Sequence, residues 1–505
     1  MLKRRTALLS GAALAACGGM PPVFAPDTGP GDGAPATPRE FRGAWVAAVD
    51  NIDWPSRQGL PAAQQQRELR AIVERAAALG LNALVVQVRP ACDALYASTL
   101  EPWSEYLTGT QGLPPGYDPL AMWIEEAHAR GIEVHAWFNP YRARHSTAKG
   151  VLAANHVAQR RPAWVRPYGD LLWLDPGEPE AMAHSLAVIA DVTARYDVDG
   201  VQVDDYFYPY PLKPPGGGDD LPFPDEPAWN RARAVGVMLA RDDWRRRNVD
   251  RFVQQMFERV RGIKPWVKVG ISPFGLPRPD RRPPGIEGFS QYDRLYADVE
   301  RWLAEGWLDY LAPQLYWAME PRAQAFGALV EAWARSNARG RHLWPGLFTS
   351  AVARPPRQWT ADELLAQLAH LRGQRAKAGG FIHFSMAALM DDRGGLASRL
   401  LAARPGAALV PASPWLGAAR PAPPRLTRAA QQIRVQAAPG GEPARWLALW
   451  VRRGGAWRFA VRPADASSVV PAQDSGGALE ALVATSVGRS GVESERVTLA
   501  SLTDH

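Results

Sequence analysis

Between residues 40 and 402, short apolar runs alternate with longer segments that carry a single apolar stripe. Runs rich in β-branched side chains are typical of buried strands, and a stripe at helical spacing is typical of an amphipathic helix. The expected strands cover residues 44–49, 82–88, 132–137, 199–203, 267–271, 309–314, 343–347 and 380–384. Two of the expected helices carry Leu69, Ile72, Val73, Ala76 and Leu79, and, after a cap at Ser290, Leu295, Val299, Trp302 and Leu303.

Eight strand–helix units in one stretch predict an α/β fold of the (β/α)8 TIM-barrel type. Gly80, Gly131 and Gly306 each precede an expected strand and fit the ends of the preceding helices. A doubly wound sheet is the alternative architecture. However, no G-x-G-x-x-G motif follows the first expected strand, so the barrel is favoured.

The C-terminal part of the chain has a different pattern. Residues 403–424 are rich in Pro and Ala and are expected to be a linker. Residues 425–505 contain short apolar runs at 433–436, 446–450, 457–461 and 481–486, separated by turn residues. This order predicts a small all-β sandwich that resembles a fibronectin type III domain.

The N-terminus reads as a targeting segment. Lys3, Arg4 and Arg5 precede an apolar run over residues 7–16, which is too short to cross a bilayer. Residues 14–18, Leu-Ala-Ala-Cys-Gly, resemble a bacterial lipobox, in which the Cys becomes the lipidated first residue. We therefore expect a signal peptide over residues 1–16, a lipid on Cys17 that attaches the protein to a membrane, and a tether over residues 17–39. An ordinary signal peptide that is cleaved elsewhere is the alternative.

Composition narrows the classes of function. The net charge of +7 falls to +4 once residues 1–16 are removed, and no basic run alternates with aromatic residues, so we expect no nucleic-acid partner. Two Cys exclude a disulfide framework and a cysteine-built zinc site. There is no H-E-x-x-H, P-loop or G-x-S-x-G motif, and we expect no metal and no cofactor. The 20 Trp suggest aromatic platforms in addition to core packing.

Asp204 and Asp205 are the strongest candidates for catalysis. They directly follow the expected strand at 199–203, although Asp is a poor strand former. Residues at the C-terminal ends of barrel strands line the active face of a TIM barrel. Crowded carboxylates also raise the pKa of one of them, which suits it to act as a general acid. We favour Asp204 as the direct participant, although alternation along the strand does not show which side chain faces inward.

Other strand ends carry residues suited to binding sugar. Amides and charged groups hydrogen-bond hydroxyls, and aromatic rings lie against the apolar faces of sugar rings. The expected substrate-binding residues are Arg89, His135, Trp137, Asn139, Tyr141, Arg142, Tyr206, Tyr208, Gln314, Tyr316 and Trp317. Asp93, Glu101 and Glu105 are candidates for a second catalytic carboxylate, with structural anchoring of their loop as the alternative for the two Glu. A carboxylate pair is what glycoside hydrolysis requires.

Several segments resemble the glycosyl-hydrolase-like family 10 lipoproteins and stand in the family's order. They are residues 41–46, 51–56, 87–90, 101–109, 135–142, 204–209, 244–248, 270–275 and 313–317. The resemblance implies a (β/α)8 barrel over residues 40–402 and, from characterised relatives, cleavage of peptidoglycan glycan strands that lack stem peptides. The loop at residues 278–287 departs from the family pattern: it is rich in Pro and Arg and looks shorter than usual.

The expected function is therefore that of an exported, lipid-anchored glycoside hydrolase of the cell envelope, facing the periplasm from the outer membrane. Its expected partner is a glycan polymer, and the C-terminal domain would bind a cell-wall or division protein. Two alternatives stay open: a glycan-binding scaffold that does not cut, and a hydrolase of another polysaccharide such as α-glucan.

Overall fold

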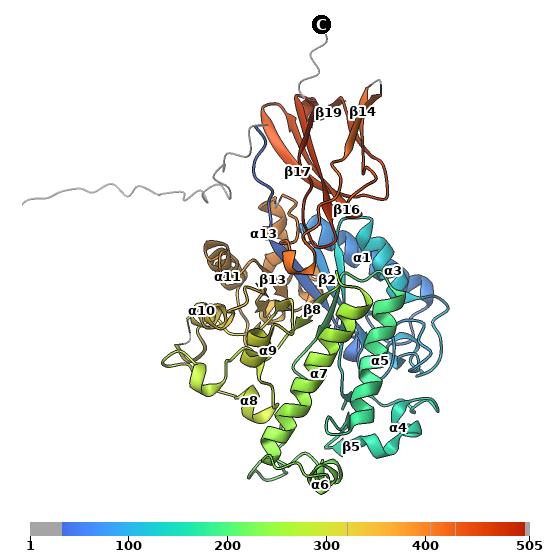
Figure 1. The fold of residues 1–505 in the computed structure, drawn as a ribbon, viewed down its shortest axis with the longest axis vertical. Coiled ribbons are helices and arrows are strands. Elements are labelled where there is room, and N and C mark those ends of the chain that lie inside the picture. The colour runs from blue at the N-terminus through green and yellow to red at the C-terminus, as the bar shows by residue number, and fades with distance from the viewer. Residues whose placement is uncertain (1–32, 321, 405, 430, 500–505) are drawn as a thin grey trace, which may run out of the picture. The chain divides into compact units, whose positions relative to one another are not determined.

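The computed structural model describes residues 33–320, 322–404, 406–429 and 431–499. The expected signal peptide and Cys17 lie outside these residues. Parallel strands form one curled sheet, in which neighbouring strands along the chain pair with each other (Figure 1). The strands are β1 (Phe41–Val46), β2 (Ala83–Arg89), β3 (Glu133–Phe138), β7 (Gly200–Val203), β8 (Lys268–Ile271), β9 (Tyr310–Leu311), β10 (Gln314–Leu315), β11 (His342–Leu343), β12 (Gly346–Leu347) and β13 (Gly380–His383).

The sheet closes through strands that are split in two. On one side β8 pairs with β9, and on the other β13 pairs with both β12 and β1; β9 pairs with β11 and β10 with β12, which joins the two sides. The continuous strands expected at 309–314 and 343–347 are instead interrupted before Pro313 and Pro345, because proline has no N–H to donate to the ladder. The carbonyls of these two prolines still accept from the next strand, from Gly346 N at 2.9 Å and Ile382 N at 3.0 Å. The predicted barrel is confirmed.

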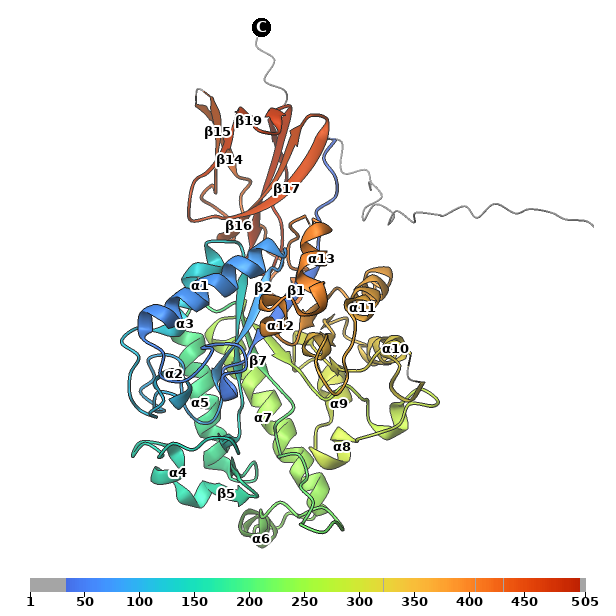
Figure 2. The same cartoon turned by 180° about the vertical axis from the view of Figure 1, so that it is seen from behind.

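Helices follow the strands and lie around the outside of the sheet (Figures 1 and 2). The main ones are α1 (Ala62–Ala78), α3 (Pro119–His128), α5 (Pro179–Arg195), α7 (Arg241–Ile263), α9 (Val299–Glu305), α10 (Phe326–Ser336), α11 (Ala361–Gly373) and α13 (Leu396–Ala402). Shorter elements in the connections are α2 (Glu105–Thr108), α4 (Val157–Arg160), α6 (Glu226–Ala234), α8 (Gln291–Arg294), α12 (Met386–Met390) and the antiparallel strands β4 (Arg142–Arg144), β5 (Val165–Tyr168) and β6 (Leu171–Leu174).

Of the two helices predicted from their apolar residues, one is present as predicted and the other is not. The predicted stripe on α1 is buried, at Leu69, Ile72, Val73 and Ala76. The single helix expected after Ser290 is wrong, because the chain forms α8 and then α9, with Tyr296 between them at a φ of 56°. A positive φ does not fit a right-handed helix.

The C-terminal part folds into antiparallel strands. One sheet contains β14 (Arg425–Ala429), β15 (Gln432–Gln436) and β18 (Ser468–Pro471), and the other contains β17 (Ala456–Pro463), β16 (Ala444–Arg453), β21 (Ala481–Gly488) and β22 (Val497–Leu499). A short hairpin, β19 (Gln473–Asp474) and β20 (Gly477–Ala478), lies between β18 and β21 in the chain. The two sheets share a hydrophobic core that includes Ile433, Val435, Leu447 and Leu482. The expected all-β module is confirmed.

Candidate active site

Asp204 and Asp205 lie at the C-terminal end of β7. All four residues of this strand are buried, and the strand ends at Val203. The two aspartates are themselves only 4% and 1% exposed. Burial disfavours the charged form of a carboxyl group, so two such groups side by side are unusual unless other residues stabilise them.

Asp204 is held by two donors from β3 and the residue that follows it. Trp137 Nε1 donates to Asp204 Oδ2 at 3.1 Å, and Asn139 Nδ2 donates to the same oxygen. Burial raises the pKa of Asp204 to about 7, and the charge of Asp205 adds to this rise, against the opposing effects of Arg142 and the donors. Both of these donors act on Oδ2, whereas Oδ1 accepts a longer bond from Tyr206 N at 3.4 Å, so a proton on this carboxyl belongs on Oδ1.

Asp205 is held by a different set of residues. The Tyr210 hydroxyl donates to Asp205 Oδ2, and the Gln314 side chain also hydrogen-bonds to this carboxyl group. Burial raises the pKa of Asp205 to about 6, and the Tyr210 and Gln314 bonds oppose the rise. Tyr210 is a site residue that the sequence analysis missed, although it continues the alternation of Tyr206 and Tyr208.

Half-buried aromatic residues surround the two carboxyl groups. The Arg142 guanidinium lies 4.8 Å from the centre of the Tyr206 ring, and its charge acts on both aspartates. Tyr316 stacks on Phe348 at a centroid distance of 4.9 Å, and burial raises the pKa of its hydroxyl, with the charge of Asp205 adding to the rise. Trp317 packs edge-on against Phe274. The structure therefore gathers Arg142, Tyr206, Gln314 and Tyr316 about the aspartates.

Four of the expected sugar-binding residues are buried in other surroundings. Arg89 pairs with Glu101, and both side chains are 1% exposed. His135 lies inside the barrel, 2.8 Å from the Tyr310 hydroxyl and 3.1 Å from Glu133. Tyr141 and Tyr208 are fully packed, against Phe252 and against Phe223 and Tyr296 respectively. None of these four side chains is exposed to a substrate in this structure.

The three candidates for a second carboxylate lie in the connection after β2, and each has a hydrogen-bond partner elsewhere than at Asp204 and Asp205. Asp93 accepts from Ala91 N at 3.0 Å. Glu101 accepts from Arg89 and lies 2.8 Å from His184 Nε2. Glu105 lies in the first turn of α2 and accepts from Gly150 N at 3.2 Å. These contacts favour the alternative reading, in which the two Glu anchor the loop.

Asp53 is a further buried carboxyl group, in the loop after β1. It accepts from Ala47 N, from the Ser385 hydroxyl and from Ala387 N, each at 2.7 Å. Burial raises its pKa to about 6 against these three bonds. Because Ser385 follows β13, Asp53 joins the loops after the first and last strands of the barrel.

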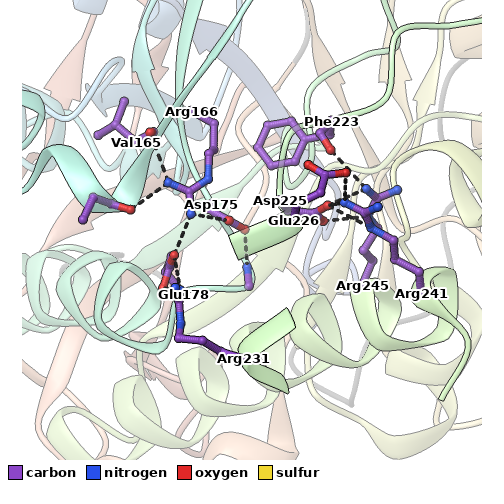
Figure 3. Close-up of polar contacts among 12 residues, drawn as sticks. Val165, Arg166, Asp175, Glu178, Phe223, Asp225, Glu226, Arg231, Arg241 and Arg245 are labelled. Atoms are coloured by element: carbon purple, nitrogen blue, oxygen red, sulfur yellow. Dashed lines mark hydrogen bonds and ion pairs between the residues drawn. The ribbon is translucent and has the colours of Figure 1, made fainter. Parts of the chain in front are cut away.

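Two ion-pair clusters brace the long connections that follow β3 and β7 (Figure 3). In one, Arg166 of β5 pairs with Asp175 at 3.0 Å and with Glu178 at 2.6 Å, and Glu178 also pairs with Arg231 of α6. In the other, Arg245 of α7 donates to both oxygens of Asp225 at 2.7 Å.

The second cluster also contacts two aromatic residues, Tyr208 and Tyr296. The Arg245 guanidinium donates to the Tyr296 hydroxyl at 2.6 Å and lies over the Tyr208 ring. Tyr208 thus acts as a support for the connection that carries Tyr206 and Tyr210.

Within the described residues, no group of three or more His, Cys, Asp or Glu side chains could hold a metal ion. No helix in the part of the chain that the structure covers is long and apolar enough to cross a membrane.

The sequence model of the glycosyl hydrolase-like 10 family matches residues 40–361. The chain belongs to this family. Glycosyl hydrolase YngK of Bacillus subtilis is 40% identical over 402 residues, which cover 77% of each protein. Glycosyl hydrolase DigH of Escherichia coli K12 is 36% identical over 356 residues, which cover 66% of this chain and 79% of DigH. The glycoside hydrolase domain of PgaB (BpsB) from Bordetella bronchiseptica aligns with a TM-score of 0.47 at 15% identity, over 72% of this chain and 98% of that domain. Family membership and the similarity to the two glycosyl hydrolases YngK and DigH support a glycoside hydrolase.

Proposed function

We propose that this glycosyl hydrolase-like 10 protein cleaves glycosidic bonds in cell-wall glycan, on peptidoglycan strands stripped of stem peptides. The observation that carries the proposal is the pair of buried carboxyl groups at the end of β7, Asp204 and Asp205, which have different partners and raised pKa values of about 7 and about 6. Glycosidases depend on carboxyl groups whose surroundings set their pKa values apart.

In this proposal Asp204 is the general acid. With a pKa of about 7, much of it is protonated near neutral pH, and Oδ1 carries the proton because Trp137 and Asn139 donate to Oδ2. The proton passes to the glycosidic oxygen as the bond to the leaving sugar breaks. Asp205 is more often ionised at the same pH, and its negative charge stabilises the positive charge that develops on the sugar ring. A water molecule then bonds to the anomeric carbon, and the proton that it loses returns to the Asp204 carboxylate.

The surroundings of the aspartates suit a neutral polyhydroxylated chain. The half-buried rings of Tyr206, Tyr316 and Trp317 offer flat faces to sugar rings, and Gln314, whose Nε2 donates to the Ser272 carbonyl at 3.0 Å, offers its Oε1 as an acceptor for hydroxyl groups. We propose a polymer rather than a small sugar as the substrate for two reasons. The family resemblance implies cleavage of cell-wall glycan strands, and the N-terminal segment resembles that of an exported lipoprotein.

We further propose that the protein is anchored through Cys17 in the outer membrane and faces the periplasm. The C-terminal sandwich is proposed to bind a cell-wall or division protein. Both proposals rest on the sequence, on the lipobox-like residues 14–18 and on the presence of a separate β module after residue 424.

The test is incubation of the purified protein with denuded glycan strands, with intact sacculi and with starch. Release of soluble fragments from denuded strands, lost in Asp204→Asn and Asp205→Asn while both variants still bind the strands, supports the proposal. Binding without release by the wild type would show a scaffold rather than an enzyme. Release from starch alone would show an α-glucan hydrolase.

A further inference from the structure

Gln87 of β2 is fully buried, and its amide has a fixed orientation. Its Oε1 accepts from two backbone N–H groups, Ala48 N at 2.9 Å and Val49 N at 2.8 Å. An amide oxygen that faces two donors cannot exchange places with the NH2 group, because the NH2 group would then face two N–H groups. The loop after β1 therefore sets which end of the Gln87 amide points to its third neighbour.

That neighbour is Asn139, which is also fully buried. Gln87 Nε2 donates to Asn139 Oδ1 at 2.6 Å. With its oxygen committed to Gln87, Asn139 presents its Nδ2 group to Asp204 Oδ2, where it forms the bond described above. The chain of hydrogen bonds thus runs in one direction, from the backbone of Ala48 and Val49 through two amides to the carboxyl group of Asp204.

We infer that Gln87 is a positioning residue for the proposed reaction: it forces Asn139 to act as a donor and thereby keeps Asp204 Oδ2 as an acceptor and Oδ1 as the oxygen that carries the proton. The inference rests on the proposed function of Asp204 as general acid. Gln87 does this through Asn139, from β2, which lies on the side of β3 opposite to β7.

Among the described residues, the other groups near Asp204 do not fix the orientation of the Asn139 amide. Trp137 Nε1 donates to Oδ2 whatever the state of Asn139. Arg142 lowers the pKa of Asp204 and Asp205 raises it. Tyr206, Tyr210 and Tyr316 are the remaining titratable neighbours, and burial raises the pKa of each of their hydroxyls, so they stay neutral at the pH of interest. Asn139 is the neighbour whose role as donor depends on a second side chain.

The test is Gln87→Glu, which keeps the shape of the side chain. One carboxylate oxygen still accepts from Ala48 and Val49, but the other needs a donor, so Asn139 must turn its Nδ2 group toward residue 87. Asn139 Oδ1 then faces Asp204 Oδ2, and two acceptors tolerate this contact only when Asp204 is protonated. We expect the pKa of Asp204 to rise by about one unit or more, which moves the basic limb of the kcat/KM profile to higher pH.

Gln65→Glu is the matched control. Gln65 is also buried, and its Nε2 donates to the carbonyls of Leu60 and Leu107, but it belongs to α1 rather than to this chain of bonds. Gln65→Glu is expected to lower stability and to leave the basic limb where it is. Gln87→Met, which adds no charge and frees the Asn139 amide, is expected to lower kcat and to shift the basic limb less than Gln87→Glu does.

A second measurement separates this inference from the proposed function. The pKa of Asp204 can be followed by 13C NMR of labelled aspartate, with Asp204→Asn used to assign the signal. If the wild type releases no fragments, the proposed function fails, but a higher Asp204 pKa in Gln87→Glu still supports the relay. If the wild type is active and the Asp204 pKa moves by less than about half a unit in Gln87→Glu, the inference is overturned.

Discussion

Replacing Arg89 by methionine should destabilise the barrel strongly, because Arg89 and Glu101 form an ion pair whose two side chains are each 1% exposed. The Arg89 guanidinium donates to both Glu101 oxygens, at 2.8 and 2.5 Å, and to the carbonyls of Asn139 and Pro140 at 2.7 and 2.9 Å. Methionine fills most of the same volume but donates nothing, so it leaves a buried carboxylate and two carbonyls without these donors.

The magnitude follows from the shift in the pKa of Glu101. Burial alone would raise this pKa, but Arg89 and His184 lower it from 4.5 to about 2. At about 1.4 kcal/mol per unit, this shift corresponds to about 3 kcal/mol of folding free energy at neutral pH. Breaking a buried ion pair by removing one partner costs a similar 3–5 kcal/mol, roughly, in other proteins. We therefore expect Arg89→Met to lose about 3 kcal/mol or more.

The assay is urea unfolding followed by tryptophan fluorescence. Because the pKa of Glu101 is lower in the folded state, its contribution to stability is present above pH 4.5 and is lost as the pH falls toward 2. The difference between wild type and Arg89→Met should shrink over that range. Arg70→Met is the control: Arg70 pairs with Glu126 at 2.8 Å but is 47% exposed, so its loss should cost less than about 1 kcal/mol.

A double variant, Arg89→Met with Glu101→Leu, should regain part of the lost stability, because an apolar pair can replace a buried ion pair. The reasoning is refuted if Arg89→Met is as stable as the wild type and instead binds glycan more weakly. That outcome would return Arg89 to the role of a sugar-binding residue.

Three further predictions concern the proposed function. Activity should fall as the pH rises through about 7, where Asp204 loses its proton, and as it falls through about 6, where Asp205 gains one; a flat profile of kcat/KM over this range would contradict the assignment. Tyr210→Phe removes the hydroxyl that donates to Asp205, so the acidic limb alone should move to higher pH, by less than about one unit, in the same assay. Cys17→Ser should abolish incorporation of labelled fatty acid and release the protein from membranes, and unchanged labelling would rule out Cys17 as the anchor.

Most of the fold follows from the hydrophobic pattern. Where the strands and helices differ from the prediction, the difference has a physical cause. The eight predicted strand positions all fall on barrel strands, because the inner and outer faces of a barrel strand are both buried and give continuous apolar runs. The splits before Pro313 and Pro345 could have been read from the prolines themselves. The break at Tyr296 could not, because no Gly or Pro marks it and the aromatic contact with Tyr208 and Arg245 holds it.

The site is less predictable, because polar residues at strand ends serve both the substrate and the barrel. Arg89 and His135 satisfy the same sequence rule as Asn139, since all three stand on or directly after a strand. Only the three-dimensional partners separate them: Glu101 for Arg89, Tyr310 for His135 and Asp204 for Asn139. Such partners lie 12 to 175 residues away along the chain, beyond the reach of any local pattern.

The end of β7 explains why alternation along the strand could not assign the two aspartates. Alternation holds while a strand is paired, but β7 ends at Val203, and the backbone then turns so that Phe207 N donates to the Asp205 carbonyl at 3.0 Å. Asp204 takes two donors from β3 and the residue after it and a longer bond from Tyr206 N at 3.4 Å, whereas Asp205 takes donors from Tyr210 of its own connection and from Gln314 of β10. The Trp137 bond that lowers the pKa of Asp204 therefore comes from the barrel, whereas the Tyr210 bond that lowers the pKa of Asp205 comes from a connection whose position is held by Arg245 and Asp225. Loss of the Tyr210 hydroxyl should consequently act more on the acidic limb of the pH profile, which Asp205 sets, than on the basic limb, which Asp204 sets.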